Sequence, residues 1–66
     1  MKIKINGREE ELTQKKSLFE VISDKGLIPD HVVVEHNSRI VPKEEWRKTT
    51  LTENDNIEIV SFVGGG

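Results

Sequence analysis

The 66-residue sequence has no cysteine, which excludes disulfide bonds, thiolate metal ligands and a thiol nucleophile belonging to this chain. It has no apolar run near the ~20 residues that a membrane-spanning helix requires. The first residues alternate and then turn, which is not the pattern of a signal peptide. We therefore expect a cytoplasmic protein that does not bind to a membrane.

The sequence also lacks an excess of charge of one sign. Its 10 basic and 12 acidic residues are interspersed and give a formal net charge of −2, which is typical of a solvated surface and not of a nucleic-acid interface. A chain of this size buries only ~60% of the surface of its unfolded form, enough for one modest core without a catalytic cleft. We expect one domain, monomeric when free, that is not an enzyme and does not bind nucleic acid.

The first part of the sequence predicts a β-hairpin. Residues 2–5 alternate between lysine and isoleucine, which is the period of a half-buried strand. Asn6-Gly7 tolerates the positive φ angles of a type I′ turn, so a return strand is expected over residues 8–13.

A helix is predicted over residues 18–25. Ser17 and Glu20 have the spacing of a capping box, in which each side chain binds the backbone N–H of the other residue. Gly26 supplies the left-handed residue that ends many helices, and Pro29 prevents the helix from resuming.

The second half predicts short strands and one helical turn. Residues 32–34 are β-branched and favour a central strand, and Asn37-Ser38 is typical of a turn before a short strand over 38–41. Residues 43–46 can form one helical turn after a proline. Residues 57–63 predict the last strand.

This order of elements predicts an α+β fold of the β-grasp (ubiquitin-like) type, in which one main helix packs across one face of a mixed sheet. The first and last strands would lie side by side in parallel. We expect residues 1–63 to form the domain and residues 64–66 a flexible tail. The predicted core consists of Ile3, Ile5, Leu12, Leu18, Val21, Ile22, Val32, Val34, Ile40, Ile57 and Ile59.

The sequence ends in three glycines, Gly64, Gly65 and Gly66. At an average glycine usage of ~7%, this ending arises by chance in roughly one chain in 3,000. Glycine also loses more entropy on ordering than any other residue, so fold stability does not explain the run. A frayed end without a role, or a cloning scar, would give the same pattern. We favour a function, because a tail without Cβ atoms can thread a narrow channel and present the Gly66 carboxylate to another protein.

A carboxylate is a poor electrophile, so Gly66 would need activation, for which an acyl-adenylate is the best candidate. The sequence has no Gly-x-x-x-x-Gly-Lys-Ser/Thr loop to hold ATP phosphates. It has no cysteine to supply sulfur either. Activation and sulfur must therefore come from partner proteins, and we expect this chain to bind no cofactor.

Asn37, the run Ile40-Val41-Pro42 and Trp46 form the densest motif of the chain. The motif matches the pattern Asn-x-x-(Ile/Val)-Val-Pro-x-x-x-Trp of the bacterial sulfur carriers of thiamin thiazole biosynthesis, the ThiS family. The chain resembles this family over its full length, although residues 8–31 match only in the pattern of elements. The other matching positions are Asp55, residues 57–62 and the ending Val63-Gly64-Gly65-Gly66.

The resemblance implies a mechanism centred on Gly66. An E1-like adenylating enzyme, ThiF, would use ATP and Mg²⁺ to form an acyl-adenylate at the Gly66 carboxylate. A persulfide sulfur from a donor protein would displace AMP and leave a thiocarboxylate, and thiazole synthase, ThiG, would receive the sulfur. Gly64 and Gly65 would thread into the partner enzymes.

Val60 and Phe62 are the candidate docking residues. Ile57 and Ile59 share one face of the last predicted strand, so Glu58, Val60 and Phe62 take the other face. If the helix covers the isoleucine face, Val60 and Phe62 are exposed beside the tail, and exposed apolar patches often mark docking surfaces. A β-bulge that turns Phe62 inward is the alternative.

Two other features have simpler explanations. Trp46 is the only tryptophan, and packing in a small core explains it better than a partner contact does. His31 and His36 have no third ligand candidate nearby, so we expect no metal site.

Three classes of function remain open. The first is a thiocarboxylate carrier, either of thiamin biosynthesis or of the molybdopterin-synthase type. The second is a ubiquitin-like modifier that forms an isopeptide bond through Gly66. The third is an interaction module whose tail is incidental.

Overall fold

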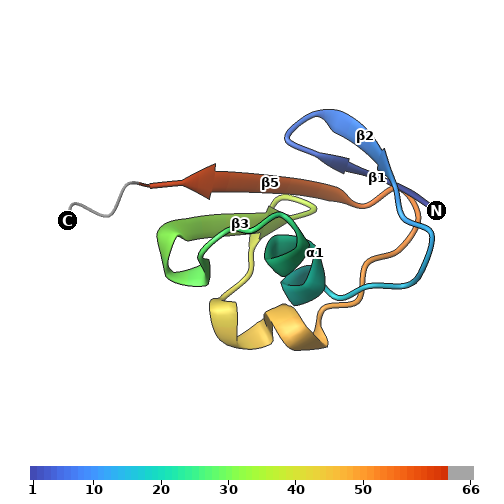
Figure 1. Cartoon of the computed structure of the whole chain (residues 1–66). Helices are drawn as coiled ribbons and strands as arrows, with labels where there is room; N and C mark the ends of the chain where they lie inside the picture. The colour runs from blue at the N-terminus through green and yellow to red at the C-terminus, as the bar shows by residue number, and fades with distance from the viewer. Residues whose placement is uncertain (63–66) are drawn as a thin grey trace.

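The computed structural model describes residues 1–62, which form a five-stranded mixed sheet with the order β2-β1-β5-β3-β4. One α-helix and a 3-10 helix contact each other on one side of this sheet (Figure 1). The elements in chain order are β1 (Lys2–Ile5), β2 (Arg8–Glu11), α1 (Leu18–Asp24), η1 (Pro29–His31), β3 (Val32–His36), β4 (Arg39–Ile40), η2 (Lys43–Lys48) and β5 (Asn56–Ser61).

The strand pairing confirms the predicted α+β fold. β5 lies in the middle of the sheet, parallel to β1 on one side and antiparallel to β3 on the other. The helix α1 covers one face, and Figure 1 shows no helix of residues 1–62 on the opposite face of the strands. In residues 1–62, no helix is both long enough and apolar enough to cross a membrane.

The predicted hairpin is present, with a shorter second strand. Asn6 and Gly7 have φ angles of 52° and 82°, as a type I′ turn requires. β2 ends at Glu11 and not at Thr13, because Glu11 is the partner of Lys2, the first residue of β1. Beyond that pair the two segments remain hydrogen-bonded for one more residue, since the Leu12 N–H donates to the Met1 carbonyl at 2.8 Å.

The helix forms as its capping residues predict. The Ser17 hydroxyl accepts a hydrogen bond from the Glu20 N–H at 3.1 Å, and the Glu20 carboxylate accepts one from the Ser17 N–H at 2.8 Å. Gly26 follows the helix with a φ angle of 71°, a conformation that glycine adopts without steric cost. The short helix η1, by contrast, was not predicted from the sequence.

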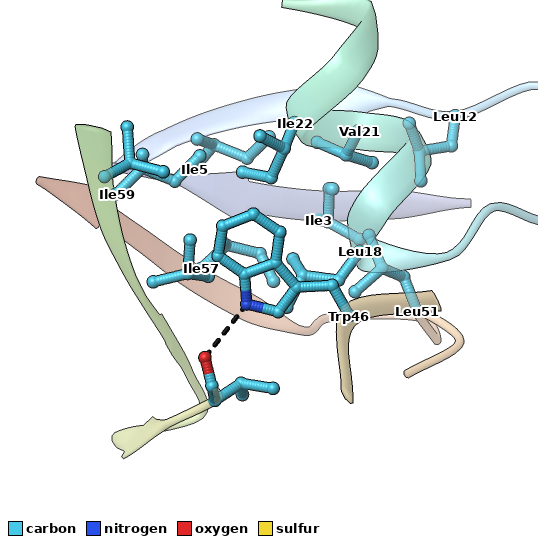
Figure 2. Close-up of a cluster of buried hydrophobic side chains, with 13 residues drawn as sticks. Ile3, Ile5, Leu12, Leu18, Val21, Ile22, Trp46, Leu51, Ile57 and Ile59 are labelled. Atoms are coloured by element: carbon cyan, nitrogen blue, oxygen red, sulfur yellow. Dashed lines mark hydrogen bonds between the residues drawn. The ribbon is translucent and has the colours of Figure 1, made fainter. Parts of the chain in front are cut away.

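Trp46 packs at the centre of the core with 1% of its surface exposed (Figure 2). Its indole Nε1–H donates a hydrogen bond to the Val41 carbonyl at 2.9 Å, so the polar edge of the ring is also satisfied. The prediction that Trp46 is a core residue is confirmed. It lies on η2, which runs to Lys48 and is therefore longer than the helical turn expected over residues 43–46.

The predicted core is correct at every position except Ile40. Ile40 is 62% exposed because it pairs with Glu35 on the face of the sheet that α1 does not cover. The next residue, Val41, points inward instead, and Leu51 is a further core residue that the strand and helix patterns did not identify. The buried apolar side chains are Ile3, Ile5, Leu12, Leu18, Val21, Ile22, Val32, Val34, Val41, Trp46, Leu51, Ile57 and Ile59.

Candidate functional site

The uncovered face of the sheet near the end of β5 is exposed and apolar. Ile57 and Ile59 are buried beneath α1, whereas Val60 is 62% exposed and Phe62 46% exposed. The sequence left open whether Val60 and Phe62 are exposed or turned inward by a bulge, and in the structure both are exposed. Whether these side chains dock a partner stays a prediction.

The alternative, a β-bulge that turns Phe62 inward, is wrong. β3 and β5 pair without interruption, from His36 opposite Ile57 to Val32 opposite Ser61. The Phe62 N–H then donates to the His31 carbonyl at 2.9 Å, which continues the same register one residue beyond the strand.

Two more apolar side chains lie on this face. Val33 is the direct partner of Val60 in the β3–β5 ladder, and Ile40 lies on the neighbouring strand β4. Both are exposed. We call Val33, Ile40, Val60 and Phe62 the open-face patch. Exposed apolar side chains that are grouped on one face of a small protein often mark an interaction surface, and this role of the open-face patch stays a prediction.

Asn6 holds the part of β5 that leads to the open-face patch. β1 ends at Ile5, but the Asn6 side chain takes the place of a further strand residue beside β5. Its Oδ1 accepts from the Ile59 N–H at 2.7 Å, and its Nδ2 donates to the Ile59 carbonyl at 3.2 Å. Sequence reasoning identified Asn6 only as a turn residue, because this contact joins positions 53 residues apart.

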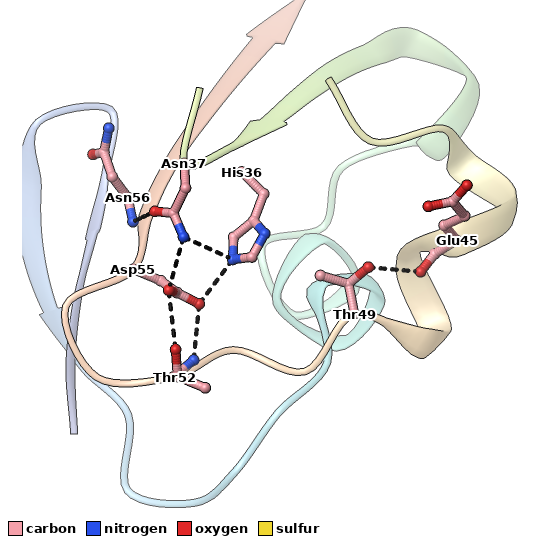
Figure 3. Close-up of polar contacts among 7 residues, drawn as sticks. All are labelled: His36, Asn37, Glu45, Thr49, Thr52, Asp55 and Asn56. Atoms are coloured by element: carbon pink, nitrogen blue, oxygen red, sulfur yellow. Dashed lines mark hydrogen bonds and ion pairs between the residues drawn. The ribbon is translucent and has the colours of Figure 1, made fainter. Parts of the chain in front are cut away.

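Asp55 holds the other end of β5. It is 6% exposed and lies in the loop directly before the strand (Figure 3). Its Oδ2 is 2.8 Å from His36 Nε2 and accepts from the Thr52 N–H at 2.8 Å. Its Oδ1 accepts from Asn37 Nδ2 and from the Thr52 hydroxyl, each at 3.0 Å.

The Asn37 side chain completes this network. Its Oδ1 accepts from the Asn56 N–H at 2.8 Å, so one amide joins the β3–β4 turn to the first residue of β5. Asn37 belongs to the motif that ends at Trp46 and Asp55 is a separate position that matches the family, and the structure brings the two together. Their contacts are structural, since they fix where β5 begins and hence where its far end points.

The electrostatics of Asp55 follow from these contacts. Burial alone would raise the pKa of this carboxyl, because it disfavours the charged form. The hydrogen bonds from His36, Thr52 and Asn37 act in the opposite direction and are stronger together, so they lower the pKa of Asp55 to about 2. Asp55 is therefore a carboxylate at any physiological pH.

The remaining predicted site residues are not part of the described structure. Gly64, Gly65 and Gly66 lie outside residues 1–62, as does Val63, the predicted last residue of the final strand. The boundary between domain and tail thus stays a prediction. As for metals, the described residues contain no group of three histidine, aspartate or glutamate side chains that could hold an ion, and His36 is bound to Asp55.

Comparison with known proteins assigns the family. The sequence model described as the ThiS family matches residues 3–66, which is nearly the whole chain. The chain belongs to the ThiS family. It is also 51% identical, over 35 residues, to the sulfur carrier protein ThiS of Bacillus subtilis, a match that covers 53% of each chain.

Structural comparison agrees with this membership. The chain superposes on the crystal structure of the thiamine biosynthesis protein ThiS from Geobacter metallireducens with a TM-score of 0.84 and 26% identity, covering all of both chains. ThiS sulfur carriers are not catalysts, and membership of the family therefore supports the prediction that this chain is a carrier and not an enzyme.

A longer relative contains a domain of this kind as one part. The chain is 35% identical over 66 residues to a thiazole synthase of Paramagnetospirillum magneticum, and the match covers the whole chain but only 20% of that protein. The ThiS-family chain thus spans about a fifth of the length of this curated relative.

Proposed function

We propose that this chain is a sulfur carrier of thiamin biosynthesis and that Gly66 carries the sulfur as a thiocarboxylate. The observation that carries the proposal is the match of residues 3–66 to the ThiS family, which includes the glycine run. The similarity to a protein named as the sulfur carrier ThiS supports the same function.

The proposed chemistry takes place at the Gly66 carboxyl group. An E1-like adenylating enzyme transfers AMP from Mg-ATP to the carboxylate, which converts it into an electrophile. A persulfide sulfur of the donor protein then attacks the carbonyl carbon, a C–S bond forms, and AMP leaves, which gives an acyl disulfide between Gly66 and the donor. A thiol of a partner protein then attacks the donor sulfur of that S–S bond, forms a disulfide with it, and releases the thiocarboxylate on Gly66. The resulting thiocarboxylate is the nucleophile that thiazole synthase receives.

In this proposal residues 1–62 present the tail and do no chemistry. β5 is fixed at its start by Asp55 and near its end by Asn6. The open-face patch lies toward the end of β5 and docks the partner enzymes through Val60 and Phe62. A cytoplasmic location, where these enzymes would be met, belongs to the proposal as well.

Intact mass spectrometry tests the function directly. The protein is purified from sulfur-replete cells that express the partner enzymes, and its mass is compared with that of a variant lacking Gly66. A gain equal to one sulfur replacing one oxygen, present only in the full-length protein and mapped to Gly66, is the expected result.

Three other outcomes of this experiment would contradict the proposal, and each would identify a different function. Adducts on lysines of other proteins would identify a ubiquitin-like modifier. A thiocarboxylate that molybdopterin synthase accepts and thiazole synthase does not would identify a carrier of another pathway. A tail that stays unmodified with ATP and the adenylating enzyme would leave only an interaction module.

A further inference from the structure

Two glutamates lie directly opposite each other on the uncovered face of the sheet. Glu35 on β3 is the partner of Glu58 on β5 in an uninterrupted antiparallel ladder. Side chains at such positions have Cβ atoms about 5 Å apart, and like charges there destabilise the sheet. Two carboxylates in this place therefore work against folding.

No cation of residues 1–62 lies within ion-pair distance of these two charges. Within residues 1–62, neither Glu35 nor Glu58 takes part in an ion pair, although several other acidic side chains do. Glu58 is exposed and Glu35 is partly buried, so both carboxylates are accessible from the same side.

The two glutamates also lie inside the open-face patch. Along the ladder, the next pair on this face is Val33 and Val60, and Ile40 is the partner of Glu35 on its other side. A carboxylate pair bordered by exposed apolar side chains would lose water when the patch is covered. It could then remain charged only beside a cation, because an unpaired buried charge is costly.

We propose that Glu35 and Glu58 together bind one basic side chain, an arginine or lysine, on the surface of thiazole synthase when the open-face patch docks there. The inference rests on the proposed function. Charge complementarity selects the chemistry of the partner residue, since a guanidinium can donate to two carboxylates at once. The similarity to a thiazole synthase that contains such a domain within its own chain favours that enzyme as the partner.

The test is calorimetric titration of thiazole synthase from the same organism with the full-length chain and its variants at several salt concentrations. The variant E35Q/E58Q removes both charges and keeps the side-chain shape. We expect its affinity to fall roughly tenfold, as the loss of exposed to partly buried ion pairs predicts, and its affinity to depend less on salt.

A matched control changes the net charge equally. Glu9 and Glu44 are exposed, form no ion pair within residues 1–62 and lie outside the patch. E9Q/E44Q should leave the affinity within about twofold of the wild type. In addition, E35Q/E58Q should melt at a higher temperature than the wild type, because it removes a repulsion, whereas a structural role for the glutamates predicts a lower melting temperature.

Several results would overturn the inference. If E35Q/E58Q binds as tightly as the wild type while V60A/F62A binds weakly, the patch docks the synthase but the glutamates do not contribute. If E35Q/E58Q weakens binding only to the adenylating enzyme, the commitment to thiazole synthase is wrong. Neither result affects the sulfur-carrier proposal, which depends on the mass of the tail and not on these affinities.

Discussion

Asp55 is buried, and its two carboxylate oxygens contact His36, Asn37 and Thr52. These contacts join the β3–β4 turn to the loop before β5. They favour the charged form of the carboxyl, and they lower its pKa from 3.8 to about 2. The contacts are lost on unfolding, so protonation of Asp55 is linked to stability.

The sign of this linkage gives a pH prediction. Because folding lowers the pKa of Asp55, the charged carboxylate stabilises the folded state. This stabilisation is fully present above the pKa of the unfolded chain, near 4, and is lost as the pH falls toward 2. Removing the charge in D55N should cost about 2 kcal/mol of unfolding free energy at neutral pH. The difference between wild type and D55N should shrink between about pH 4 and pH 2 in urea titrations. A difference that stays constant over this range would show that the Asp55 charge is not linked to folding.

Ile40 and Val41 are adjacent apolar residues with opposite environments. Ile40 is 62% exposed and Val41 is 5% exposed. I40A should change the unfolding free energy by no more than about 0.5 kcal/mol, as is usual for surface positions, whereas V41A should cost about 2 kcal/mol through lost burial and a cavity. Chemical denaturation of the two variants compares them directly. Equal losses would mean that Ile40 is part of the core after all.

At the scale of elements, β5 is the strand on which the proposed function depends. β3 supports it along one edge, while β1 pairs with only its first residues. The Asn6 side chain extends that support to Ile59. The position of the second half of β5 therefore depends partly on one amide group.

This dependence can be measured with N6G, which keeps a residue suited to the positive φ angle but removes the amide. The Ile59 N–H and carbonyl lose their partners, so we expect a loss of about 1–2 kcal/mol and faster hydrogen exchange at the Ile59 amide. N54G is the matched control, since Asn54 also has a positive φ angle of 69°. If exchange at Ile59 is the same in N6G and N54G, the amide does not hold β5.

The elements differ in how far the sequence determines them. The Asn6-Gly7 turn and the Ser17–Glu20 capping box were predictable because residues close in sequence form them. The exposure of Val60 also followed from strand alternation. Three other features depend on the register between distant strands, which a single sequence does not specify. They are the burial of the Val41 side chain, the hydrogen bonds around Asp55, and the pairing of Glu35 with Glu58.

At the scale of the whole molecule, the sheet has one face that packs into the core and one face that is exposed among residues 1–62, where we propose that partners bind. α1 and η2 close the core on the first face, and the open-face patch lies on the second. Stability and binding should therefore respond to different residues.

Phe62 provides the test of this separation. F62A should lower the affinity for the adenylating enzyme or thiazole synthase at least several-fold, as the loss of an exposed aromatic anchor predicts. Its melting temperature should change little, because the side chain is 46% exposed. A large drop in melting temperature with normal partner affinity would contradict the docking role.

The central claim is that the Gly66 carboxyl group carries sulfur. Its most direct test is the intact mass of the protein after incubation with the adenylating enzyme, Mg-ATP, a persulfide donor and a thiol that cleaves the acyl disulfide. The account predicts a mass gain of sulfur for oxygen at Gly66, and none in a folded variant that lacks Gly66. An unchanged mass in the full-length protein, under conditions in which the same enzymes modify another ThiS-family carrier, would contradict the account.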